Sequence, residues 1–151
     1  MTAAVSGTLL AFDFGERRIG VAVGETSTAI ASPLTAIVAA ANDARFSAIE
    51  ALVREWQPSA FVVGRPRHSD DSPHRIAALA SKFARRLAAR YALPVFFVDE
   101  TLTSAESEAT LREVRTRAGR TGDVDALAAA LILQSYLDDP TGFPPSGTES
   151  R

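Results

Sequence analysis

An aspartate ends the first apolar run of this chain, where a buried strand is predicted. The run Leu9–Phe12 ends at Asp13, and a second apolar run, Ile19–Val23, follows a short polar turn that contains Gly15. Two such runs around a short turn predict a β-hairpin. Aspartate is depleted from strands, and burying an unpaired carboxylate is costly. Asp13 therefore needs a partner such as a divalent cation, unless it caps the hairpin turn through its own backbone.

Length and composition exclude several classes of protein. A chain of 151 residues predicts a single domain. The absence of cysteine excludes disulfides and thiolate metal sites and fits a reducing compartment. No pattern of a signal peptide or membrane helix is found, so a cytoplasmic protein with no membrane partner is expected. The net charge of −2 gives no global nucleic-acid footprint.

The order of the predicted elements is that of an α/β domain. Pro33 confines the strand predicted within 28–38 to a sheet edge, unless the strand begins only at Leu34. Its following helix is capped near Asn42 or Asp43 and ended by Pro58. The further elements are buried strands at 60–64 and 95–100, a helix carrying 76–90, a helix over 103–114, and a last helix from Asp123 or Asp125 to Leu137. This order predicts a central mixed five-stranded sheet, an antiparallel β-meander followed by parallel strands, flanked by helices. We expect a flexible N-terminus at 1–7, one domain at 8–138 and a flexible tail at 139–151.

Carboxylates from three distant segments are expected at one edge of this sheet. They are Asp13, Asp99, Glu100 and Asp125. In open α/β sheets the site lies at the carboxyl ends of the strands. Two carboxylates about 4 Å apart repel by ~4 kcal/mol at an effective dielectric of ~20, so such a cluster favours a cation. All-oxygen ligands suit Mg²⁺ or Mn²⁺, and paired ions support phosphodiester cleavage. The alternatives are that Asp99 caps a turn and Asp125 is a helix N-cap.

Four motifs, in the same order from about Leu9 to Leu137, resemble the YqgF/RuvX family. They are Asp13–Gly15 with Arg18–Val23, Val62–Gly64 followed by Pro66, Val98–Glu100 with Leu102–Glu106, and Asp125–Ala129 with Ile132–Leu137. The family is described as pre-16S rRNA nucleases and, earlier, as Holliday-junction-resolvase-like. The resemblance implies an RNase H-like fold, Mg²⁺-dependent phosphodiester hydrolysis, and trimming of the 5′ end of 16S rRNA precursor.

The resemblance also implies roles for individual acids. Asp13 matches the metal ligand of the first strand, and Asp125 matches the acid of the last helix. Either Glu100 or Asp99 matches the acid of the later strand. Successive strand residues point to opposite faces, so one of these two is expected at the metal, and Glu100 is favoured.

The chain departs from the family pattern at two places where substrate contacts are expected. The first is Arg65–Arg67 followed by Asp70–Ser72, where the family has a neutral residue, proline and later Asp-Gly-Ser. The second is Gly122–Val124 before the helix acid, where the family has a basic cluster. The residues expected to bind nucleic acid are Arg18, Arg65, Arg67, Arg75 and Arg120, with a solvated charged surface as the alternative. His68 is either a general acid or base or an exposed bystander.

The leading hypothesis is a two-metal-ion nuclease acting on structured RNA. Its expected partner is pre-16S rRNA, including rRNA on the pre-30S particle, and its expected state is a monomer or weak homodimer. A Holliday junction resolvase acting on branched DNA is one alternative, and it would need a two-fold dimer. A non-catalytic RNA-binding ribosome assembly factor is another. A sugar-kinase-like ATP site needs two domains, and this chain has room for one.

Overall fold

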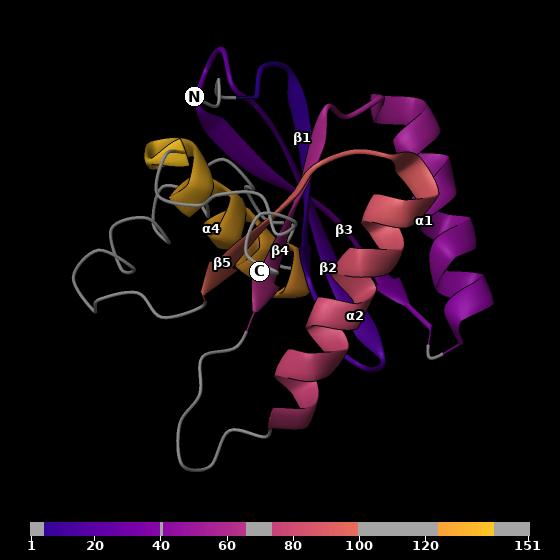
Figure 1. Ribbon diagram of the computed structural model, residues 1–151. Helices are drawn as coiled ribbons and strands as arrows, with labels where there is room; N and C mark the ends of the chain where they lie inside the picture. The colour runs from indigo at the N-terminus through magenta and orange to yellow at the C-terminus, as the bar shows by residue number, and fades with distance from the viewer. Residues whose placement is uncertain (1–4, 40, 66–73, 100–123, 141–151) are drawn as a thin grey trace.

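A five-stranded sheet forms the centre of the computed structural model, which describes residues 5–39, 41–65, 74–99 and 124–140 (Figure 1). The strand order is β3-β2-β1-β4-β5. The strands are β1 (Thr8–Asp13), β2 (Arg18–Glu25), β3 (Ile30–Val38), β4 (Ala60–Arg65) and β5 (Val95–Asp99). The helices are α1 (Asn42–Trp56), α2 (His74–Tyr91) and α4 (Val124–Asp138).

The sheet is mixed, as the sequence predicts. β2 runs antiparallel to both β1 and β3, whereas β4 runs parallel to both β1 and β5. β3 lies at one edge, which is where Pro33 is tolerated because it cannot donate a ladder hydrogen bond. The register between β2 and β3 shifts at Val21/Ala22, opposite this proline.

Helices cover both faces of the sheet. α1 and α2 lie on one face and α4 lies on the other (Figure 1). The period of two along β1 divides its side chains between the two cores: Leu10 and Phe12 pack on the α1–α2 side, and Leu9 and Ala11 pack on the α4 side. This division decides on which face a residue at the end of a strand lies.

The ends of α1 differ in how well the sequence predicts them. The helix begins one residue earlier than expected, because the N-cap is Ala41, which has an extended backbone and supplies no side-chain cap. The predicted cap at Asn42 or Asp43 is therefore wrong. The C-terminal end agrees with the sequence: α1 stops at Trp56, and Gln57 adopts a left-handed conformation just before Pro58.

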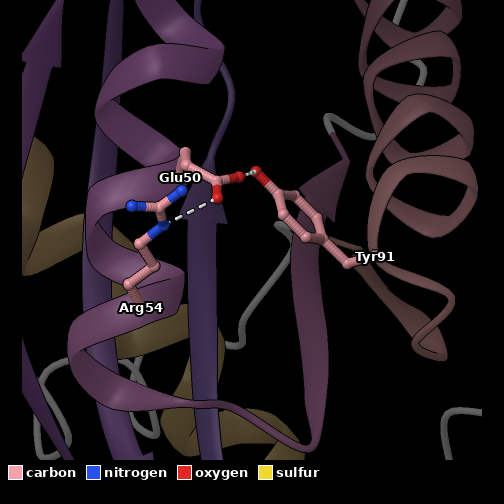
Figure 2. Close-up of polar contacts among 3 residues, drawn as sticks. All are labelled: Glu50, Arg54 and Tyr91. Carbon is pink, nitrogen blue, oxygen red and sulfur yellow. Dashed lines mark hydrogen bonds and ion pairs between the residues drawn. The ribbon is translucent and has the colours of Figure 1, made fainter.

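Two side chains, Glu50 and Gln134, form polar contacts that tie helices to their neighbours. Tyr91 of α2 donates a hydrogen bond to Oε1 of Glu50 in α1, at 3.0 Å, and Arg54 donates to Oε2 of the same carboxylate, also at 3.0 Å (Figure 2). In α4, the buried amide of Gln134 accepts from the Ala31 N–H at 3.0 Å and donates to the Ala29 carbonyl at 2.9 Å. Gln134 therefore attaches the β2–β3 hairpin to α4.

The helix predicted over 103–114 and most of the tail predicted at 139–151 lie outside the described residues. Within the described ranges, no helix combines the length and apolar character required to cross a membrane.

Candidate active site

Asp13 lies at the carboxyl end of β1, in the middle of the sheet. Its backbone neighbours are two glycines, Gly20 of β2 and Gly64 of β4. Asp13 has the same strand parity as Leu9 and Ala11, so it belongs to the face that α4 covers. Its side chain is half-buried, which fits a carboxylate at the rim of a core.

Asp125 lies in the first turn of α4, directly against Gly20, the β2 neighbour of Asp13. A Cβ built on Gly20 would be 1.9 Å from the Asp125 carbonyl oxygen and 3.1 Å from its Cα. Only glycine leaves room for this approach of helix and strand backbones. Directly opposite residues of an antiparallel pair have Cα atoms about 4.5–5.5 Å apart. The structure therefore brings Asp13 and Asp125 together, although 111 residues separate them in the sequence.

Arg18 is the third charged group at this position. Its Nε donates to Oδ2 of Asp125 in an ion pair that links the start of β2 to the start of α4. The Arg18 side chain is 52% exposed and that of Asp125 is 30% exposed, so solvent screens the pair and its contribution to stability is about 0–1 kcal/mol. The pair places a guanidinium beside the acid at a solvent-accessible edge.

Some of the remaining candidate residues lie in the described part of the chain, and others lie outside it. Asp99 ends β5 and is the parallel ladder partner of Arg65, which ends β4. Both strands therefore end at the same sheet edge as Asp13, whose partner Gly64 precedes Arg65. Arg75 lies in the first turn of α2. Glu100, Arg67, His68 and Arg120 lie outside the described residues.

The two acids that are brought together fit a hard divalent cation as ligands. Both supply carboxylate oxygens, which Mg²⁺ and Mn²⁺ prefer. In the described part of the chain no group of three or more His, Cys, Asp or Glu residues is placed to hold a metal ion. The pair therefore offers part of a coordination sphere, and water and further oxygens would have to complete it.

Arg45 of α1 is a residue of this region that the sequence analysis missed. It is 6% exposed, and its Nε donates to the Ala39 carbonyl at 2.9 Å. Its Nη2 donates to the carbonyls of Gly15, at 3.3 Å, and Glu16. Burial lowers the pKa of Arg45 from its ordinary value, and the nearby Glu16 carboxylate opposes that shift. The buried guanidinium thus holds the turn that follows Asp13.

Sequence comparison gives close relatives along most of the chain. A protein of Dechloromonas aromatica named "Putative pre-16S rRNA nuclease" is 55% identical over 135 residues, which cover 89% of this chain and 92% of the relative. A protein of the same name from Paraburkholderia xenovorans is 46% identical over 91% of this chain and 92% of its own length.

Structural comparison shows the fold. The structure titled "T. thermophilus RuvC in complex with Holliday junction substrate" matches with a TM-score of 0.58 at 17% identity, covering 92% of this chain and 99% of the other. The yeast mitochondrial Holliday junction resolvase Ydc2 matches with a TM-score of 0.57 at 10% identity, over 90% and 80% of the two chains. The RNase H-like fold implied by the family resemblance is confirmed. The family model described as "RuvX: Holliday junction resolvase" matches residues 7–139, and with the close relatives this shows that the chain belongs to the RuvX family.

Proposed function

We propose that this protein is a metal-dependent nuclease that hydrolyses phosphodiester bonds at the edge of the sheet where β1 meets α4. The observation that carries the proposal is the contact of Gly20 with the backbone of Asp125, next to Asp13 in the ladder. The backbones of the two acids lie close at this point, and carboxylates that share a site repel each other unless a divalent cation lies between them. The names of the relatives and the description of the family support a nuclease.

The ligand set we propose is Asp13, Asp125 and Glu100. Val98 packs on the α4 face, and the strand period of two is the reason for preferring Glu100 over Asp99 as the third acid. When bound, Mg²⁺ or Mn²⁺ would activate a water as the nucleophile and stabilise the leaving oxygen. In a two-ion arrangement these two effects would come from the pair of ions together.

The chain's own residues prepare the site for a polyanion. Gly20 lets the first turn of α4 reach the sheet, and Arg45 holds the turn after Asp13. Arg18 forms an ion pair with Asp125, and we propose that it exchanges Asp125 for a substrate phosphate. Arg65, Arg67, Arg75 and Arg120 remain proposed phosphate contacts.

The proposed substrate is structured RNA, specifically the 5′ end of 16S rRNA precursor in the cytoplasm. The shared name of the relatives supports this choice. Cleavage of branched DNA is the second candidate, supported by the description of the family. It would require a homodimer that presents two sites to opposed strands.

Depletion of the protein in its own host tests this function. Primer extension on total RNA should show 16S precursor with an unprocessed 5′ end, which the wild-type protein corrects and Asp125→Asn does not. Asn at residue 125 keeps the size of the side chain and removes its charge. Glu55→Gln, at an exposed acid of α1, is the matched control and should restore maturation.

The other functions predict different results, in this experiment or in a cleavage assay with the purified protein. Normal 5′ ends after depletion contradict a role in rRNA processing. Restoration by Asp125→Asn supports a non-catalytic assembly factor. Cleavage of a four-way DNA junction by the purified protein, with no effect on rRNA, supports the resolvase.

A further inference from the structure

A basic groove lies between α1 and α2, on the face of the sheet opposite to the acids. Its floor is formed by the rings of Phe14, Phe46 and Phe83. Its rim carries Lys82 and Arg86 of α2. The groove continues along α2 to Arg90, whose guanidinium lies 4.6 Å from the centre of the Phe46 ring. We call this surface the α1–α2 groove.

The cations of the α1–α2 groove form a regular row. Lys82, Arg86 and Arg90 are four residues apart on one helix, so they share a face and follow one another about 6 Å apart along its axis. Asp43 is the one acid that lines the described groove. A local excess of positive charge on a chain with net charge −2 is a feature that overall composition conceals.

Within the described part of the chain, two of these cations lack the partner that a structural role would give them. Within the described ranges, neither Lys82 nor Arg86 forms an ion pair with a carboxylate, although Arg86 is half-buried. A half-buried cation is more stable with an anion beside it. The N-terminus of α1, which also borders the groove, has no side-chain cap and adds a weak positive field.

The groove is connected to the candidate active site through one turn of chain. Phe14 on its floor directly follows Asp13. Arg45, which lines the groove, holds the Gly15 and Glu16 carbonyls of the turn between β1 and β2. A strand of nucleic acid that crosses this turn would reach the acids from the groove.

We propose that the α1–α2 groove binds consecutive phosphates of the nucleic-acid substrate, beyond the bond that is cleaved. A row of cations matches a line of phosphates better than it matches a single anion. The two hollows of the groove have volumes of about 90 and 300 Å³, below and at the lower limit of the ~300–1,000 Å³ of small-molecule pockets. The proposal rests on the proposed function for the presence of a nucleic acid.

Binding across a salt series tests the groove separately from catalysis. The probe is a fluorescein-labelled RNA hairpin with the 5′ leader sequence of 16S precursor, followed by anisotropy in EDTA so that no cleavage occurs. Lys82→Ala and Arg86→Ala should each lower the salt slope by roughly 0.7–0.9 and weaken binding, and the double variant by roughly twice that. Arg85→Ala, an exposed arginine of α2 that does not line the groove, should leave the slope unchanged.

The outcomes separate the groove from the active site. A double variant that folds like wild type, by circular dichroism and thermal unfolding, and keeps the full slope overturns the groove. Polyglutamate is the second probe in the same anisotropy assay. If the double variant loses binding to polyglutamate but keeps its binding to RNA, the proposal is also overturned, because the groove would then bind an acidic protein. If the wild-type protein cleaves RNA but the double variant keeps the full salt slope, the groove is overturned and the proposed function is unaffected. Wild type that binds neither RNA nor a DNA junction overturns both proposals.

Discussion

Gly20 and Asp125 are in backbone contact at the point where β2 meets the first turn of α4. The contact leaves no space for a side chain at residue 20, because a Cβ would lie 1.9 Å from the Asp125 carbonyl oxygen. Gly20 is also the ladder partner of Asp13. One glycine therefore determines how closely a strand acid and a helix acid approach each other.

Gly20→Ala should displace the N-terminal turn of α4 and impair the site. Overpacking a tight contact costs about 1–3 kcal/mol of unfolding free energy, and a backbone neighbour cannot move aside by changing rotamer. Urea unfolding and metal-dependent cleavage should both show the loss. Gly24→Ala is the comparison on the same strand: its nearest atoms are the Ile30 carbonyl oxygen at 2.9 Å and side-chain ends of Leu133 and Leu137 at 3.0 and 3.1 Å, a milder clash away from Asp125. Equal cleavage by both variants would contradict a special role for Gly20.

Asp13→Asn should keep the fold and abolish metal-dependent hydrolysis. Asn has nearly the same size, and removing one charge relieves repulsion with Asp125 in the metal-free protein, so thermal stability should stay equal or rise. Calorimetry without metal and Mn²⁺-dependent cleavage measure the two effects. Glu55→Gln removes an exposed charge on α1 and should change neither. Full activity of Asp13→Asn would exclude this residue as a metal ligand.

Arg45→Lys should destabilise the protein although it keeps the charge. Lysine has no planar fork with which to reach the Ala39, Gly15 and Glu16 carbonyls together. Hydrogen bonds to a charged group are worth about 1.5–3 kcal/mol, so a loss of about 1–3 kcal/mol is expected in urea unfolding. Arg54→Lys, at an exposed arginine of the same helix, should stay within about 0.5 kcal/mol. A wild-type unfolding midpoint for Arg45→Lys would contradict the account of the turn.

The Glu50–Tyr91 contact between α1 and α2 should make stability depend on pH (Figure 2). The hydrogen bond from Tyr91, followed by that from Arg54, lowers the pKa of Glu50 below its ordinary 4.5. The contribution of Glu50 is therefore present above pH 4.5 and is lost as the pH falls through the lowered pKa. Burial, followed by the bond to Glu50, raises the pKa of Tyr91 above 10, so its contribution is lost as the pH rises through that higher value.

Tyr91→Phe tests the acidic side of this dependence. The pKa of Glu50 should rise toward its ordinary value in Tyr91→Phe, and it should also rise in Arg54→Ala, which removes a second hydrogen bond and a nearby positive charge. Titration of the Glu50 carboxyl carbon by NMR measures both shifts. An unchanged pKa in Tyr91→Phe would show that the hydrogen bond is not formed in solution.

The sequence was sufficient for the parts of the fold that depend on pattern. The apolar runs predict the strands, Pro33 predicts the edge, and Pro58 predicts the end of α1. Arg45 and Gln134 could not be predicted in the same way, because their partners are backbone groups far along the chain. The start of α1 was missed because Ala41 carries no capping side chain.

The candidate site was likewise predicted in part from the sequence. The motif order and the family resemblance predict that Asp13 and Asp125 lie at one site. The means of bringing them together, a missing Cβ at Gly20, depends on the crossing of α4 over β2, which only the three-dimensional arrangement shows. The α1–α2 groove also escapes the sequence, since Lys82 and Arg86 there look like ordinary outward residues of an amphipathic helix.

Anomalous diffraction from Mn²⁺-soaked crystals tests the central claim most directly. The account predicts a peak about 2 Å from carboxylate oxygens of both Asp13 and Asp125 in the wild-type protein, and its loss in Asp125→Asn. A protein that cleaves RNA in the same buffer but shows no Mn²⁺ between these two carboxylates would contradict the account.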